Sequence, residues 1–162
     1  MPEYPLVFTF TDKVAGNGFL ANVAINGRAL MAKEDAFWWM LGVRPAALAE
    51  KGESPGGAYV DFRRAFTATL FDAASMADGF DSFKAEVERF FYERDETEEQ
   101  RWNAAGEAIQ SGVVTPEPPF ASLPRETPQA RPVGISVERL DNQQTFTSKD
   151  NVLDSYALSA AA

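Results

Sequence analysis

The distribution of proline is the strongest constraint on the fold. Six of the ten prolines fall within a short stretch, at positions 116, 118, 119, 124, 128 and 132. Proline fixes φ near −65° and removes a backbone donor, so this stretch is predicted to run as an extended strap rather than as regular structure. We therefore divide the chain into an α+β domain, residues 1–112, and a proline-rich extended C-terminal arm, residues 113–162.

Strand periodicity dominates the first third of the domain. Apolar residues recur at every second position, the spacing of a half-buried strand, in residues 6–11 and 19–25, and residues 28–33 and 37–43 are predicted as the next two strands. Asn26-Gly27 separates two of these stretches and is typical of a tight hairpin turn. Residues 46–50 extend the last strand beyond Pro45, and Gly16-Asn17-Gly18 is interpreted as a turn. The sequence predicts an antiparallel three- to four-stranded meander.

Three helices are predicted after these strands. Ser54-Pro55 is typical of an N-cap followed by proline at the first helical position. One apolar stripe with helical spacing then follows, formed by Tyr59, Phe62, Phe66, Leu70 and Ala73 or Ala74. This main helix is expected to pack on the sheet and to end near Gly79 in a left-handed C-cap. Two further helices are predicted over residues 81–92 and 97–112.

Spaced apolar residues indicate that the arm docks on the domain. Residues 135–137 are expected to pair briefly with a sheet edge, and residues 152–156 to form a short closing turn anchored by Val152, Leu153 and Tyr156. The predicted anchors of the arm are Phe120, Leu123, Ile135, Val137 and Phe146. Unanchored tails rarely carry so many apolar side chains.

The chain contains neither cysteine nor histidine. This excludes disulfides, zinc fingers, iron–sulfur clusters, Ser-His-Asp triads and His-ligated metals, and we predict no catalytic residues, no cofactor and no metal. The first residues lack a basic region followed by an apolar one, and no apolar run approaches the ~18 residues of a membrane span. The expected location is the cytoplasm, away from membranes.

The formal charge of −9 disfavours direct contact with nucleic acid, because it repels the phosphate backbone. Basic partners are favoured, although an acidic chain is also a common way to remain soluble. Gly52–Gly57 has the spacing of a phosphate-binding loop, but Ala58-Tyr59 stands where Lys and Ser or Thr are needed. Adjacent carboxylates such as Glu34-Asp35 and Glu98-Glu99 are typical of solvated faces. The sequence therefore predicts no enzyme.

Trp38-Trp39 is the candidate partner-binding feature, since neighbouring strand residues point to opposite faces and both rings cannot enter one core. Phe37, Trp39 and Leu41 form the longer apolar stripe and are expected to face the main helix. Trp38 and Met40 are then left as an exposed partner-binding patch that self-association, as a homodimer or higher oligomer, would cover. Alternatively, a second helical layer or the arm covers the second Trp.

The first half of the chain resembles the HicB-like antitoxin family. The matching pieces are residues 4–8, Tyr-Pro-Leu-Val-Phe, residues 48–50, Leu-Ala-Glu, and residues 52–58, Gly-Glu-Ser-Pro-Gly-Gly-Ala, within a likeness that spans residues 4–75. The resemblance implies a three-stranded sheet with one main helix, related to a partial double-stranded-RNA-binding fold. It also implies a protein that binds and masks a small basic ribonuclease toxin and self-associates.

Two departures from the family are present. The family usually has Glu where Gly57 stands, and its full-length members append a DNA-binding domain where this chain has two helices and the arm. The preferred hypothesis is a non-enzymatic, HicB-like, antitoxin-like module that binds a small basic protein. The alternatives are a homo-oligomeric structural or interaction protein and, less favoured, a carboxylate-dependent enzyme.

Overall fold

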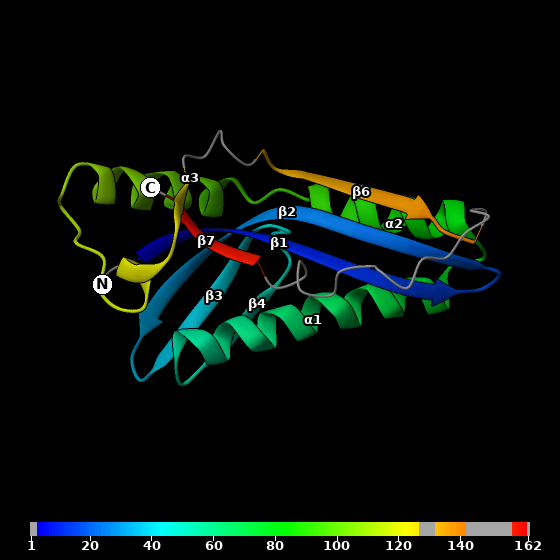
Figure 1. Cartoon of the computed structure of the whole chain (residues 1–162), viewed down its shortest axis with the longest axis horizontal. Coiled ribbons are helices and arrows are strands. Elements are labelled where there is room, and N and C mark those ends of the chain that lie inside the picture. Colours follow the sequence, from blue (N-terminus) through cyan, green and yellow to red (C-terminus); the bar gives the residue numbers. More distant parts are fainter. Residues whose placement is uncertain (1–2, 127–131, 142–156, 162) are drawn as a thin grey trace.

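The core of the protein is one sheet. A computed structural model describes residues 3–126, 132–141 and 157–161. In this part seven strands have the order β4-β3-β2-β1-β7-β5, with β6 pairing with β2 (Figure 1). They are β1 (Glu3–Gly16), β2 (Phe19–Glu34), β3 (Phe37–Arg44), β4 (Ala49–Gly52), β5 (Arg125–Glu126), β6 (Gly134–Arg139) and β7 (Ala157–Ala161). All pairs are antiparallel except β5 with β7. The α+β class is confirmed, and the sheet is larger than predicted.

Strand β2 is twice as long as expected, and the predicted hairpin at Asn26-Gly27 is wrong. The turn lies instead at Asn17-Gly18, where Gly18 has φ 75°, so that β1 and β2 form one long hairpin (Figure 1). Asn26 faces Thr9 across the strands, and its Oδ1 accepts a 3.0 Å hydrogen bond from the Thr9 hydroxyl. Gly27 lies against the Phe8 ring, where no Cβ fits. Asn26-Gly27 is therefore not a turn but part of β2, where glycine allows the Phe8 ring to lie close to the backbone.

The chain then turns twice to add two more strands. Asp35, with φ 54°, forms the turn between β2 and β3. We expected residues 46–50 to extend β3, but the chain reverses after Arg44 and β4 pairs antiparallel with β3. The Gly42 N–H donates to the Leu48 carbonyl at 2.7 Å and closes this second turn.

Three helices follow, α1 (Pro55–Met76), α2 (Phe80–Tyr92) and α3 (Glu96–Gln110). The predicted N-cap of α1 is confirmed, because the Ser54 hydroxyl accepts from the Gly57 N–H. The predicted left-handed C-cap at Gly79 is wrong. Helix α1 ends at Met76 and is followed by Ala77 in an extended conformation, and Gly79, also extended, is the N-cap of α2. Helix α3, predicted over residues 97–112, is capped by Asp95, whose carboxylate accepts from two N–H groups of the first turn.

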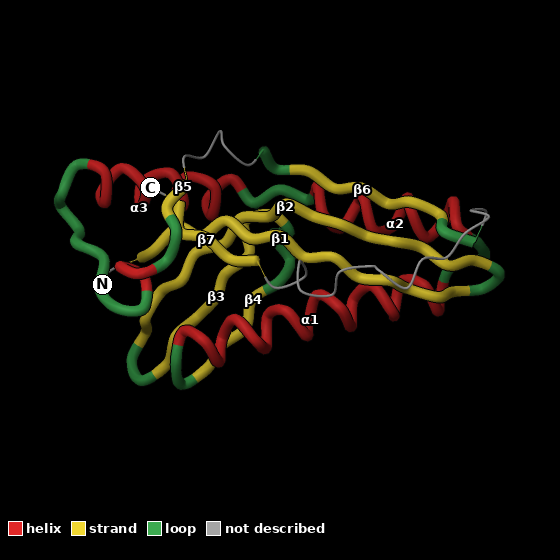
Figure 2. The backbone as a smooth tube through the Cα atoms, viewed as in Figure 1, coloured by secondary structure: helices red, strands yellow, loops and turns green. Residues whose placement is uncertain are grey.

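Helices cover both faces of the sheet. One face packs on α1 and α2, and the predicted stripe of α1 is buried there, with Phe62, Phe66 and Leu70 fully buried. The other face packs on α3 through a smaller cluster around Trp102 and Leu30. Figure 2 shows the sheet strands between α1 and α3. Two contacts attach α3 to β1: the Trp102 indole N–H donates to the Leu6 carbonyl, and Arg101 pairs with Glu3.

The arm docks on the domain in the part that the structure describes, as predicted. A short 3-10 turn, η1 (Phe120–Ser122), buries Phe120, whose ring stacks on Tyr4 at 4.1 Å. Strand β6 adds the predicted edge pairing, whereas β5 and β7 were not foreseen. Phe146 and the closing turn with Val152, Leu153 and Tyr156 lie outside the described residues.

The Phe66→Ala substitution should lower the free energy of unfolding by about 3–5 kcal/mol, because it empties a fully buried site whose ring lies 5.4 Å from that of Phe10. Phe71→Ala on the same helix, where the ring is 48% exposed, is the matched control and should cost far less. Chemical denaturation measures both, and equal losses would contradict the assigned core face.

Gly27→Ala should destabilise by roughly 1–3 kcal/mol, since the new methyl group would meet the Phe8 ring and the Arg44 carbonyl. The control is Gly106→Ala in α3, where an added Cβ meets no atom within 4 Å and helix propensity predicts a gain of roughly 0.5–1 kcal/mol. Thermal unfolding should show a lower melting temperature for Gly27→Ala and a higher one for Gly106→Ala than for wild type. A neutral Gly27→Ala would show that β2 is not as closely packed at this position.

Candidate binding sites

The predicted patch of Trp38 and Met40 is not an exposed surface. Met40 is fully buried in the core beside α1, and Trp38 is half-buried, 5.7 Å from the Phe120 ring of the arm. Phe37, expected in the core, is 38% exposed and lies under the Lys51 ammonium. The assignment of faces was therefore reversed. Alternation separates the two faces of β3 but does not say which face meets α1, and α3 covers part of the second face.

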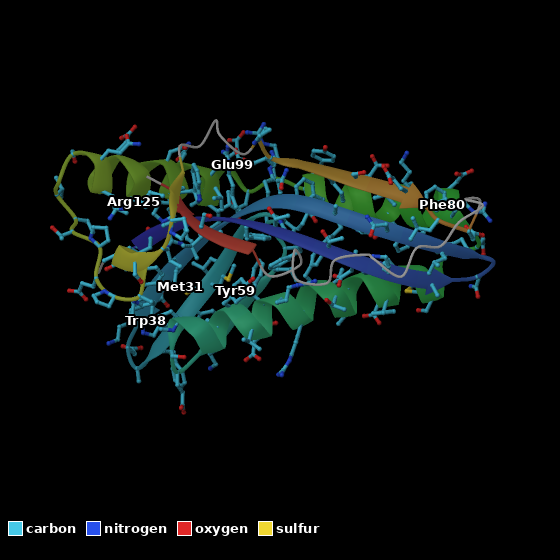
Figure 3. All side chains as sticks on the ribbon, viewed as in Figure 1. Met31, Trp38, Tyr59, Phe80, Glu99 and Arg125 are labelled. Carbon is cyan, nitrogen blue, oxygen red and sulfur yellow. The ribbon has the colours of Figure 1, made fainter. Side chains whose placement is uncertain are left out.

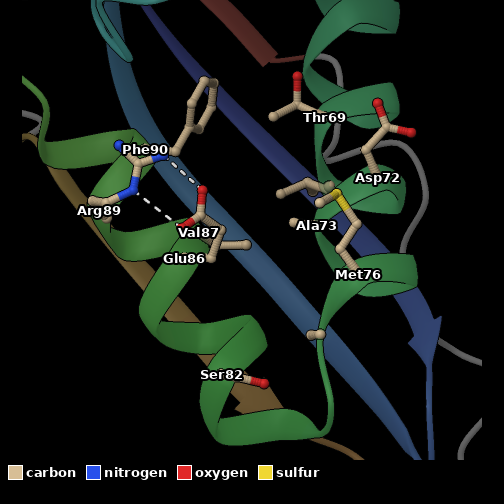
Figure 4. A pocket seen from close by; sticks show the side chains of 11 residues that line it. Thr69, Asp72, Ala73, Met76, Ser82, Glu86, Val87, Arg89 and Phe90 are labelled. Atoms are coloured by element: carbon tan, nitrogen blue, oxygen red, sulfur yellow. Dashed lines mark hydrogen bonds and ion pairs between the residues drawn. The ribbon is translucent and has the colours of Figure 1, made fainter.

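An apolar groove lies between α1 and α2 (Figure 4). It has a volume of about 520 Å³. Its walls carry mainly methyl, thioether and aromatic groups, from Leu70, Ala73, Met76, Ala77, Val87 and Phe90. Met76 is 84% exposed, an unusual state for a large apolar side chain.

The charged groups of this groove are mostly acidic. Asp72 on α1 and Glu86 on α2 line it, and the one lining cation, Arg89, donates to Glu86 at 2.6 Å (Figure 4). This hydrogen bond lowers the pKa of Glu86 from its usual range. Asp78, in the connection between the two helices, and Asp81, in the first turn of α2, are both exposed. The rim therefore favours a cationic occupant.

A second site lies on the opposite face, where α3 meets β2 and β3. A bulge between Arg28 and Ala29 shifts the register so that Arg28 faces Arg44 directly. Glu99 of α3 accepts from Arg44 Nε at 3.1 Å and from Arg94 at 2.7 Å. The Arg28 guanidinium stacks 4.5 Å from the centre of the Trp102 ring. Three guanidinium groups thus surround one carboxylate in a pocket of about 270 Å³, which we call the arginine pocket.

Charge and burial shift several pKa values in the arginine pocket. The hydrogen bond from Arg94, with a further one from Arg44, holds the pKa of Glu99 below its usual range against the opposing effect of burial. Burial lowers the pKa of Arg28, and the positive charge of Arg44 adds to this, while Glu99 opposes both. Glu99 lies towards the α3 side of the molecule, far from Trp38 (Figure 3).

One buried charged group away from both sites joins two elements of the fold. Arg63 is buried and forms a two-pronged ion pair with Asp12, at 2.8 and 2.9 Å, that joins α1 to β1. Within residues 3–126, 132–141 and 157–161, no group of three or more Asp and Glu residues is placed to hold a metal ion. In the same part of the chain, no helix combines the length and apolar character needed to cross a membrane.

Sequence reasoning missed both sites for different reasons. The groove could have been suspected from Met76, which is an apolar residue outside the buried stripe of α1. The arginine pocket left no local signal, because Arg28, Arg44 and Glu99 come from three separate elements. Comparison with protein-family models, with curated proteins and with solved structures finds no match to this chain.

Glu99→Gln should lower the free energy of unfolding by about 1–3 kcal/mol near neutral pH, because two guanidinium groups lose a charged acceptor. Since folding lowers the pKa of Glu99, its contribution is fully present above the ordinary glutamate pKa of about 4.3 and is lost as the pH falls through the folded-state value. The difference in the free energy of unfolding between wild type and Glu99→Gln should therefore become smaller below about pH 4.

The matched control is Glu107→Gln, at an exposed position of the same helix, which should stay within about 0.5 kcal/mol of wild type. Denaturant titrations across the acidic range measure the difference in the free energy of unfolding between wild type and each variant. A difference for Glu99→Gln that stays constant with pH would refute the ion-pair role of the Glu99 carboxylate.

Proposed function

We propose that this chain is a non-enzymatic, HicB-like, antitoxin-like module that binds a small basic protein, and that the partner seats an apolar segment in the groove between α1 and α2. The single observation that carries the proposal is that groove, an apolar trough with an acidic rim on a protein of net charge −9.

The order of elements supports the HicB-like part of the proposal. The resemblance implies a three-stranded sheet with one main helix, and the chain begins with the antiparallel strands β1, β2 and β3, which the short strand β4 separates from α1. The short motif at residues 52–58 supplies the cap and first turn of α1. The additional helix α2 forms the second wall of the groove, so the proposed site uses an element beyond the likeness.

The shape and chemistry of the groove support a helical or extended apolar segment as the occupant. Two helices separated by an apolar trough are a recurrent way to receive an amphipathic helix. The exposed thioether of Met76 can adapt to different partner side chains, and Phe90 offers a ring on the opposite wall. Lysine or arginine flanking the apolar segment would lie near Asp72 and Glu86.

The test compares two lysine substitutions of equally exposed apolar residues. Met76→Lys places a cation at the proposed site, where it repels a basic partner, and suits the last turn of α1 because cations are favourable at helix C-termini. Val113→Lys, at a residue 79% exposed outside the groove, is the matched control for Met76, which is 84% exposed. The full-length chain with each substitution is used to capture partners from its native host.

A basic protein that is retained in stoichiometric amount by wild type and Val113→Lys is expected to be lost with Met76→Lys. After purification, its dissociation constant should rise roughly 30-fold with Met76→Lys, which corresponds to a loss of about 2 kcal/mol at an interface hot spot. Equal binding by all three proteins would overturn the proposed site. A wild type that instead self-associates, and becomes monomeric with Met76→Lys, would favour the homo-oligomer.

A further inference from the structure

The lining of the α1–α2 groove contains three charged side chains, and two of them form a pair with each other. Arg89 donates to both carboxylate oxygens of Glu86, at 2.6 and 3.1 Å, one turn apart on α2 (Figure 4). Glu93, outside the lining, lies 3.9 Å from the same guanidinium group. The charge of Glu86 is therefore compensated within its own helix. The third charged side chain, Asp72, sets the net charge of the lining.

Asp72 lines the groove from α1 and has no cation beside it. In the part of the chain that the structure describes, its exposed carboxylate forms no hydrogen bond and no ion pair. The neighbouring Ser75 hydroxyl donates to the Asp72 backbone carbonyl at 2.9 Å and not to the side chain. The two hydroxyl groups of the lining, from Thr69 and Ser82, each donate to the backbone carbonyl of an earlier residue, at 2.9 and 3.1 Å. Asp72 is thus left as an acceptor for an occupant of the groove.

The apolar part of the groove begins one turn away from this carboxylate. Met76 follows Asp72 by four residues on α1, and residues at this spacing are neighbours on a helix surface. Ala73 continues the lining on α1, and Phe90 supplies an aromatic ring from α2. An occupant that carries a cation a few bonds from an apolar chain can therefore contact Asp72 and the apolar lining at the same time.

We infer that Asp72 determines the charge preference of the groove, by pairing with a single cation that the occupant carries next to its apolar chain. The inference rests on the proposed function, in which the occupant is a segment of a small basic protein, and it places a lysine ammonium group of that segment on the α1 wall. The α2 wall is less favourable, because Arg89 repels a cation and already holds Glu86. One unpaired carboxylate matches one positive charge.

Octylammonium is the probe, because it joins a primary ammonium group to an apolar chain, and octanoate is a similar chain of opposite charge. NMR of the full chain near neutral pH follows the thioether methyl resonance of Met76, at constant ionic strength and below the concentrations at which either probe forms micelles. A saturable shift with octylammonium is expected, with a lower dissociation constant than for octanoate. Octanoate binding as tightly as octylammonium would overturn the inference, and so would the lack of a saturable shift with octylammonium.

Asp72→Asn removes the charge and keeps the shape of the side chain at an exposed position. It should raise the dissociation constant for octylammonium about threefold, the effect of losing one solvent-exposed ion pair. Glu107→Gln, at an exposed position of α3, changes the net charge of the protein equally and is the matched control. It should change the constant less than about 1.5-fold, because solvent and salt screen a distant charge. Equal effects of the two substitutions would show that the constant reports net charge and not a contact with Asp72.

Arg89→Gln should have the opposite effect. It releases the Glu86 carboxylate, so the dissociation constant for octylammonium should fall about twofold. The matched control is Arg64→Gln, at a residue of α1 that is 78% exposed, pairs with Asp61 at 3.7 Å and lies outside the lining. This control should leave the constant close to that of wild type. A weaker binding of octylammonium by Arg89→Gln would contradict the assignment of Glu86 as the compensated carboxylate.

Capture from the native host separates this inference from the proposed function. A basic protein that is lost with Met76→Lys but binds Asp72→Asn with an unchanged dissociation constant would leave the groove as its site and refute the role of Asp72. No captured basic protein, together with an Asp72-dependent response to octylammonium, would refute the proposed function and support the charge preference of the groove.

Discussion

The pairing of β2 along both of its edges is the constraint on which the rest of the structure depends. One edge pairs with β1 over residues 19–32, and the other edge pairs with β6 over residues 21–26 and with β3 over residues 28–34. A break in this strand would separate the two halves of the sheet. Gly27 lies at the junction of these two neighbours, where the Phe8 ring comes too close for any side chain. Glycine at this position therefore keeps both halves in one sheet.

The two candidate sites follow from the way the helices divide the faces of this sheet. Helices α1 and α2 pack on one face of the sheet, and their buried side chains share a common core. The groove lies between the two helices. Helix α3 packs on the other face and brings Glu99 near the bulge at which Arg28 faces Arg44. The groove is apolar with an acidic rim, whereas the arginine pocket is cationic. Opposite chemistry on opposite faces suits them to different ligands.

Local sequence patterns predicted the helices and strands better than the way in which these elements pair and pack. The apolar stripe of α1 and the Ser54-Pro55 cap were predictable because each depends on neighbours within a few residues. Asn26-Gly27 misled because its local turn preference is weaker than the pairing of β2 with β1, a tertiary effect. Trp38 was assigned to the wrong face because alternation gives two faces without naming the covered one. The arginine pocket depends on a register shift that no local pattern encodes.

The position of β7 has a consequence for how the protein is made. Residues 157–160 form strand pairs with β1 at Leu6–Thr9, so two segments from nearly opposite ends of the sequence lie side by side. During translation, this edge of β1 has no β7 partner until the ribosome has produced those last strand residues. An open edge can recruit strands from other nascent chains, and contacts so distant in sequence form slowly. Synthesis therefore leaves a window in which β1 is vulnerable to misassembly, and the window closes only when β7 is released from the exit tunnel.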